Sequence, residues 1–259
     1  MEFGYEAMKN HDRQREIDEI SRQKPDLSRV DGAKLIHVGW PLGRVLPADR
    51  AAELIQALYS GDGCVPLSTE THALGGDTCV VAYLTQLSRE LMERSCSKCV
   101  LCREGLRQLN LVFEEITRGR SHPERLAYAR EVAQAMAVGC DCDFGKGAGR
   151  LFALALEDFA DEINQHILKK RCPALMCRAY FTVHVLADKC VGCGKCMEVC
   201  PEDAILGKDG YIHMVDQDMC QQCGKCLEVC PQHARVKAGR IKPRGPERLI
   251  RVGTYGKAR

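Results

Sequence analysis

Apolar residues recur at helical spacing through the middle of this sequence. The segments 81–94, 103–119, 124–138 and 150–168 each carry apolar side chains three or four positions apart, which predicts helices with one buried face. Four helices joined by short connections predict a small helical bundle. We attribute these apolar faces to packing of a core.

Shorter β-type patterns flank the helices. Residues 33–47 predict a strand, a Gly/Pro turn and a second strand, followed by a short helix at 49–60 and a turn-rich loop at 61–77. Four more β-like pieces follow the helices, at 181–185, 204–206, 211–215 and 234–238. The fold class is therefore α+β, with helices and strands segregated along the chain.

Five zones follow from these patterns. We expect a charged N-terminal arm at 1–30, a small mixed α/β segment at 31–78, a helical domain at 79–177, a β-containing domain at 178–238 and a basic tail at 239–259. The arm predicts an exposed helix over 5–23 that ends at Pro25. The tail is expected to be irregular, either as a solvated segment or as an arm that wraps a partner subunit.

Composition points to metal chemistry. The 259 residues include 17 cysteines. The net charge is only +2, so the chain as a whole does not have the charge of a nucleic-acid binder. No apolar run reaches the length of a membrane span, and the charged N-terminus carries no signal core. We therefore expect a cytoplasmic protein whose cysteines bind metal rather than form disulfides.

An internal repeat carries the strongest signal. CVGCGKCMEVCP at 190–201 matches CQQCGKCLEVCP at 220–231, and each copy has the spacing of bacterial two-cluster ferredoxins. Three thiolates on one tight loop hold three corners of a [4Fe–4S] cube, so the fourth cysteine of each run must cross to the other cluster. The predicted ligand sets are Cys190, Cys193, Cys196 and Cys230 for one cluster, and Cys200, Cys220, Cys223 and Cys226 for the other.

A third cluster loop lies between the first two predicted helices. SCSKCVLCREG at 95–105 repeats the three-cysteine spacing, with Cys96, Cys99 and Cys102, but no Cys-Pro follows it. The fourth ligand must come from another loop. We prefer Cys142 and keep Cys140 as the alternative, and we interpret FGKGAGR at 144–150 beside them as a turn before a helix.

These motifs resemble a known family. SCSKCVLCREG, followed by a cysteine after 39 intervening residues, resembles the C-terminal iron–sulfur domain of the NADH-oxidising flavoprotein subunit of respiratory complex I. HVGWPLGRVLP and GGDTCVVAYLTQL resemble the segments before that domain, and DEINQHILKKRCPALMCRAY leading into a two-cluster ferredoxin resembles electron-bifurcating iron-only hydrogenases and related formate dehydrogenases. The likeness implies a helical [4Fe–4S] bundle followed by a ferredoxin-like domain, in complexes of anaerobes.

The sequence also departs from that family. It shows no G-x-G-x-x-G and no comparable phosphate loop, so it resembles a truncated subunit without flavin or nicotinamide. Ser97 and Leu101 stand where the family usually has Gly and Pro. The function this implies is electron relay between a flavoprotein NAD(P)H-oxidising subunit and either ferredoxin or a further iron–sulfur or catalytic subunit. The alternatives are an NADH dehydrogenase with a divergent flavin site and a non-redox iron–sulfur scaffold.

Five cysteines lie outside these clusters. Cys172 and Cys177 have four residues between them, and His166 precedes them at a spacing that suits a zinc site. Cys79 aligns with a cysteine of the hydrogenase relatives, so the resemblance offers it as the fourth ligand. The alternative is that these are buried free thiols. We interpret Cys64 as a structural thiol and assign no catalytic residue.

Overall fold

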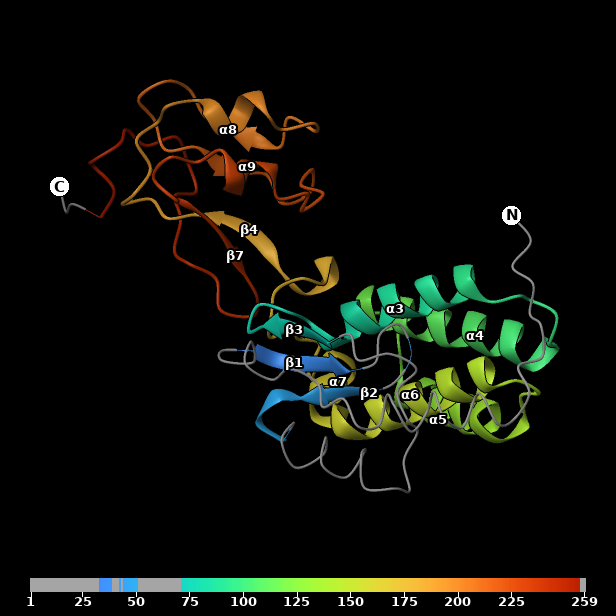
Figure 1. Ribbon diagram of the computed structural model, residues 1–259. Coiled ribbons are helices and arrows are strands. Elements are labelled where there is room, and N and C mark those ends of the chain that lie inside the picture. Colours follow the sequence, from blue (N-terminus) through green and yellow to red (C-terminus); the bar gives the residue numbers. More distant parts are fainter. Residues whose placement is uncertain (1–32, 39–41, 43, 51–70, 257–259) are drawn as a thin grey trace. The chain divides into compact units, whose positions relative to one another are not determined.

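The computed structural model describes residues 33–38, 42, 44–50 and 71–256 (Figure 1). The expected N-terminal arm and most of the helix expected at 49–60 lie outside these residues. The chain divides into two compact units, residues 1–169 and 170–259, whereas the sequence predicted a division after residue 177. The last helix of the first unit ends at Ile167, close to this division.

Helices form most of the described part of the first unit. They are α3 (Val80–Arg94), α4 (Val100–Thr117), α5 (Pro123–Gly139), α6 (Asp143–Asp158) and α7 (Ala160–Ile167). Successive helices α3 to α6 pack against one another, and the Phe113 and Phe152 rings meet in the core with centroids 5.6 Å apart. The first three predicted helices are confirmed. The fourth prediction is wrong in its bounds, because α6 begins at Asp143 and the chain breaks at Phe159 before α7.

The turn predicted at 144–150 is therefore also wrong, because this segment is the first half of α6. Its last glycine serves helix packing. A Cβ on Gly149 would lie 2.7 Å from the Ala133 carbonyl oxygen and 2.7 Å from Met136 Cβ, both on α5. Glycine is needed here because the two helix backbones approach so closely, and not because the chain turns.

A three-stranded antiparallel sheet belongs to the same unit. Its strands are β1 (Ala33–Val38), β2 (Arg44–Pro47) and β3 (Thr71–Gly75), in the order β2-β1-β3. The two strands predicted within 33–47 are confirmed, and most of the turn predicted between them lies outside the described residues. Strand β3 lies in the segment predicted as loop. Pairing with the edge of β1, where Ala73 lies opposite Ile36, makes this short polar segment a strand.

The second unit contains short strands around the two cysteine runs. It comprises η2 (Arg178–Tyr180), β4 (Thr182–Val185), α8 (Lys195–Glu198), β5 (Ile205–Leu206), β6 (Met214–Val215), α9 (Lys225–Glu228) and β7 (Arg235–Ala238). Strand β4 pairs with β7 and β5 with β6, both antiparallel, so all four predicted β pieces contain a strand. Gly194 and Gly224 precede α8 and α9 with φ of 79° and 88°, which is backbone that favours glycine.

The basic tail has no helix or strand in the part that the structure describes, up to residue 256, as expected. Part of it packs on its own unit, because the Ile212 N–H donates to the Ile250 carbonyl at 2.9 Å and the Val252 N–H to Gly210 at 3.1 Å. Among the described residues, none of the helices is both long enough and apolar enough to cross a membrane.

Candidate iron–sulfur and metal sites

Two cavities in the second unit collect the cysteines of the repeat. Each cavity is lined by the three clustered cysteines of one run and the last cysteine of the other. The first, here called the Cys190 cavity, contains Cys190, Cys193, Cys196 and Cys230. The second, the Cys220 cavity, contains Cys220, Cys223, Cys226 and Cys200. This is the crossed grouping that the motif spacing predicts.

Polar groups surround the thiols of the Cys190 cavity. Arg235 of β7 is buried and donates from Nη2 to Cys196 Sγ at 3.1 Å, and His213 Nδ1 lies 3.5 Å from the same sulfur. The Ala234 N–H donates to Cys230 Sγ at 3.3 Å. The two N–H donors aimed at cysteine sulfur, from Arg235 and Ala234, orient cluster ligands and stabilise the charge of a bound cluster.

Arg235 also provides a test of whether a cluster fits this cavity. Its Nη1 is buried and has no hydrogen-bond partner among the residues that the structure describes. A buried guanidinium N–H without an acceptor is strongly disfavoured, because arginine cannot lose its proton. A cluster in the Cys190 cavity would supply sulfur acceptors, so the residues present fit the group that the motif implies.

The two cavities do not provide equal surroundings. Burial raises the pKa of the Cys226 thiol to about 11, while the positive charge of Arg235 acts in the opposite direction. Burial lowers the pKa of His213, so this imidazole is disfavoured as a cation. Arg235 is a fixed positive charge in direct contact with a sulfur of the Cys190 cavity.

In the third cysteine loop, Cys96 and Cys99 lie between α3 and α4, as predicted, whereas Cys102 lies in the first turn of α4. Ser97 adopts a φ of 58° there, which explains why the resembled family has glycine at this position. Two hydrogen bonds hold this strained residue: its N–H donates to Ser95 Oγ at 3.2 Å, and Arg103 Nη1 donates to its carbonyl at 2.9 Å. Ser95 Oγ also lies 3.6 Å from Cys102 Sγ, next to the predicted ligands.

Both candidates for the fourth ligand lie beside this loop. Cys142 is the N-cap of α6. A hydrogen bond with Asp141 is the largest cause that raises the pKa of Cys99, and burial is the largest cause that raises the pKa of Cys102. The charge of Cys142 raises both pKa values further. Cys140 is almost fully buried, and burial raises its pKa to about 11. Both thiols therefore lie close enough to the loop to be considered, and the preference for Cys142 over Cys140 stays a prediction.

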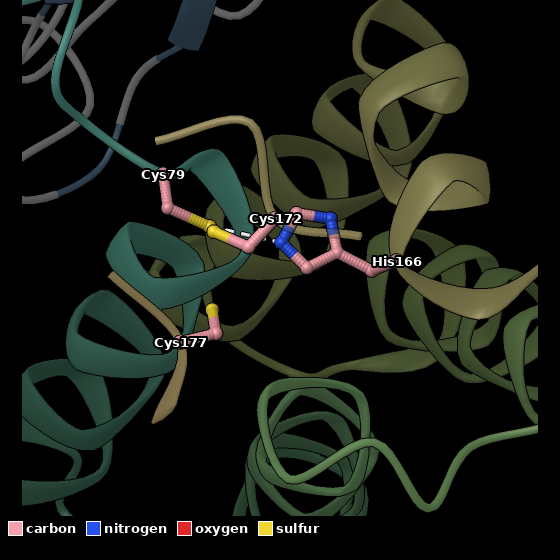
Figure 2. A group of neighbouring side chains, drawn as sticks. All are labelled: Cys79, His166, Cys172 and Cys177. Atoms are coloured by element: carbon pink, nitrogen blue, oxygen red, sulfur yellow. Dashed lines mark hydrogen bonds between the residues drawn. The ribbon is translucent and has the colours of Figure 1, made fainter. Parts of the chain in front are cut away.

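Four side chains form a separate, buried group (Figure 2). The sulfur atoms of Cys79, Cys172 and Cys177 and one imidazole nitrogen of His166 all lie within 4.8 Å of one another. Tetrahedral zinc bound by cysteine and histidine requires ligand atoms about 3.8 Å apart. The sequence predicted these four residues as a zinc site, and the structure brings their ligand atoms together.

The hydrogen bonds of His166 prepare it for a metal. Nδ1 lies 2.8 Å from the Glu162 carbonyl oxygen, which can only accept, so Nδ1 carries the proton. Nε2 then presents its lone pair 3.2 Å from Cys79 Sγ. The Glu162 carboxylate accepts from the Val80 N–H at 3.1 Å, so the same residue also fixes the backbone beside Cys79. Such supporting contacts are typical of protein zinc sites.

The fold and these sites define an iron–sulfur electron-transfer module. Residues 82–166 match the NADH-ubiquinone oxidoreductase-F iron–sulfur binding region, and residues 183–237 match a 4Fe–4S dicluster domain. The chain is therefore related to the flavoprotein subunits that its motifs resemble. The two matches together include every cysteine predicted to bind a cluster.

Curated relatives include components of two known complexes. The NADP-reducing hydrogenase subunit HndC of Solidesulfovibrio fructosivorans is 32% identical over 134 residues, which are 51% of this chain and 27% of that protein. An NADH-quinone oxidoreductase subunit of Streptomyces coelicolor is 30% identical over 118 residues, 44% of this chain and 26% of the relative. The aligned region thus spans about a quarter of the length of each relative. Crystal structures of an NAD+-reducing [NiFe]-hydrogenase align with a TM-score of 0.43 and 21% identity, over 52% of this chain and 23% of theirs.

Several site residues were not identified from the sequence. Arg235 lies just outside the cysteine run, in a segment that the sequence showed only as a β piece. Glu162 lies in a segment that showed a helical pattern and a resemblance to hydrogenases, neither of which points to a role for Glu162. The repeat held a signal for Arg235, because the equivalent position 30 residues earlier is the apolar Ile205.

Proposed function

We propose that this chain is an electron relay that holds three [4Fe–4S] clusters. The helical unit would bind one with Cys96, Cys99, Cys102 and Cys142, and the second unit would bind two in the Cys190 and Cys220 cavities. The observation that carries this proposal is the grouping of thiols, because each of the two cavities is lined by the four cysteines that one cubane cluster needs.

The proposed electron donor is a flavoprotein subunit that oxidises NAD(P)H. The relatives support this, since one is named as a subunit of an NADP-reducing hydrogenase and the other of an NADH-quinone oxidoreductase. Electrons would leave for ferredoxin or for a further iron–sulfur or catalytic subunit, in a complex that bifurcates electrons in an anaerobe. In this chain the protein's part is to hold each cluster, exclude water from it and set its potential.

A substitution in the helical unit tests the relay. Cys99→Ala removes one thiolate from a loop whose other two cysteines are already assigned, so this cluster should be lost or converted to a three-iron form. The two clusters of the second unit use other cysteines and should still assemble. In the complex with its flavoprotein, NAD(P)H should still reduce an artificial acceptor at the flavin, but freeze-quench EPR should show no NAD(P)H-driven reduction of the second unit.

Cys64→Ser is the matched control, because it removes a thiol that belongs to none of the proposed sites. It should leave both reactions unchanged. If the Cys99→Ala complex reduces the clusters of the second unit at the wild-type rate, electrons bypass the helical unit and the linear relay is wrong.

We also propose a structural zinc ion at Cys79, His166, Cys172 and Cys177. The support is the convergence of four buried ligand atoms of the types that zinc prefers, with the tautomer of His166 fixed by Glu162. Four protein ligands leave no open coordination position, so such an ion would stabilise the fold and take no part in electron transfer.

A further inference from the structure

The two cavities of the second unit arise from a repeat, but their charges differ. An offset of 30 residues pairs Gln232 and Arg235, which line the Cys190 cavity, with Glu202 and Ile205, which line the Cys220 cavity. One lysine lines each cavity at equivalent positions, so these two charges balance. The Cys190 cavity therefore has one more positive side chain and one fewer negative side chain than its counterpart.

The extra positive charge is in direct contact with a ligand. The Arg235 side chain is buried, with the residue only 5% exposed, and donates from Nη2 to Cys196 Sγ at 3.1 Å. Its Nη1 has no partner among the described residues, and the sulfur of a bound cluster would supply one. Water screens a buried charge poorly, so its effect on a nearby cluster is large.

Resting on the cluster assignment above, we propose that Arg235 is a positioning residue that makes the cluster of the Cys190 cavity easier to reduce than that of the Cys220 cavity. Reduction adds one negative charge to a cluster. Arg235 stabilises that charge at Cys196, whereas the Glu202 carboxylate opposes it in the other cavity.

At equilibrium, a single electron in this unit therefore resides on the cluster of the Cys190 cavity. One electron passes from the cluster of the Cys220 cavity to the cluster of the Cys190 cavity. The first cluster is oxidised by one electron and the second is reduced by one electron. No covalent bond forms or breaks, and the guanidinium protons stay on Arg235.

Redox titration of the full chain, followed by EPR, tests this with opposite-sign variants. Arg235→Gln should lower one midpoint potential by at least about 59 mV. For one electron, this shift is a tenfold decrease in the equilibrium constant of reduction. Because Arg235 also acts on Cys226, a second midpoint should fall by less. Glu202→Gln should raise that second midpoint, which in the wild type should be the lower of the two.

Lys237→Gln is the control, because Lys237 is an exposed positive charge on the same strand, β7. Water screens this side chain, so no midpoint should move by more than about threefold in the equilibrium constant. The proposal is overturned if Arg235→Gln also leaves every midpoint unchanged, or if the midpoint that it lowers most is the one that Glu202→Gln raises.

Two further outcomes are also decisive. If Arg235→Gln does not retain its iron, Glu202→Gln alone tests the proposal. In that case, if the lower midpoint potential of the second unit is the same in Glu202→Gln as in the wild type, the proposed difference in potential is refuted. A wild-type chain without reducible clusters in the second unit would refute the proposed function itself, before any variant is compared.

Discussion

Adding one methyl group at Gly149 should loosen the helical unit. On this glycine of α6, a Cβ would lie 2.7 Å from the Ala133 carbonyl oxygen and 2.7 Å from Met136 Cβ. The carbonyl belongs to the backbone of α5 and cannot rotate away, so Gly149→Ala must push the two helices apart. Overpacking of this kind costs about 2–3 kcal/mol. The higher helix propensity of alanine offsets about 1 kcal/mol of that cost.

The net destabilisation should therefore be about 1–2 kcal/mol. Hydrogen exchange measured on peptides from α5 and α6 reports this locally, without requiring the whole chain to unfold in one step. Amides of these helices should exchange roughly 5–30-fold faster in Gly149→Ala than in the wild type. Because Cys142 is the N-cap of α6, the variant should also lose iron from the helical unit more readily.

Gly147→Ala is the matched control on the same helix. A Cβ at Gly147 would lie 3.5 Å from the nearest atom of Leu42, an ordinary van der Waals contact. With no clash, the propensity gain should slow exchange by up to roughly fivefold. Equal effects of the two substitutions would refute the argument that close packing of α5 and α6 selects glycine at Gly149.

Three further predictions concern the metal sites and the partner. Cys142→Ala should lose the cluster of the helical unit, whereas Cys140→Ala should keep it, as measured by iron content; the reverse result would make Cys140 the ligand. The purified chain should contain about one zinc ion that resists mild chelation, and Cys172→Ala should remove the zinc without changing the iron; zinc-free wild-type protein with its full iron would contradict that site. The isolated chain should release no flavin and should not reduce dyes with NADH or NADPH; dye reduction would favour an NADH dehydrogenase with a divergent flavin site.

The cysteine groupings could be predicted from the sequence, because the spacing of ligands along the chain restricts which of them can bind the same cluster. Three thiols on one short loop can reach only one cluster, so the run from Cys190 to Cys200 implied a ligand from the other run. The cavity that contains Cys190 and Cys230 has this arrangement. The helices could be predicted for a similar reason, since a buried face imposes a period of 3.6 residues.

Features that depend on contacts between distant segments could not be predicted from the sequence. The glycines at 145–149 looked like a turn, because sequence alone does not show that Ala133 of α5 lies against Gly149. Strand β3 looked like a loop, because its structure comes from pairing with β1. Arg235 differs from Ile205 at the equivalent position of the repeat, but its contact with Cys196 spans 39 positions along the chain, so its role was not apparent.

The number of electrons that the chain accepts tests the central claim most directly. Reductive titration of the anaerobically reconstituted chain, with iron and sulfide measured on the same sample, should show uptake of about three electrons and about twelve iron atoms per chain. A chain that holds this iron but accepts no electrons would be a scaffold and would contradict the relay. Uptake of about two electrons with about eight iron atoms would contradict the third cluster, in the helical unit.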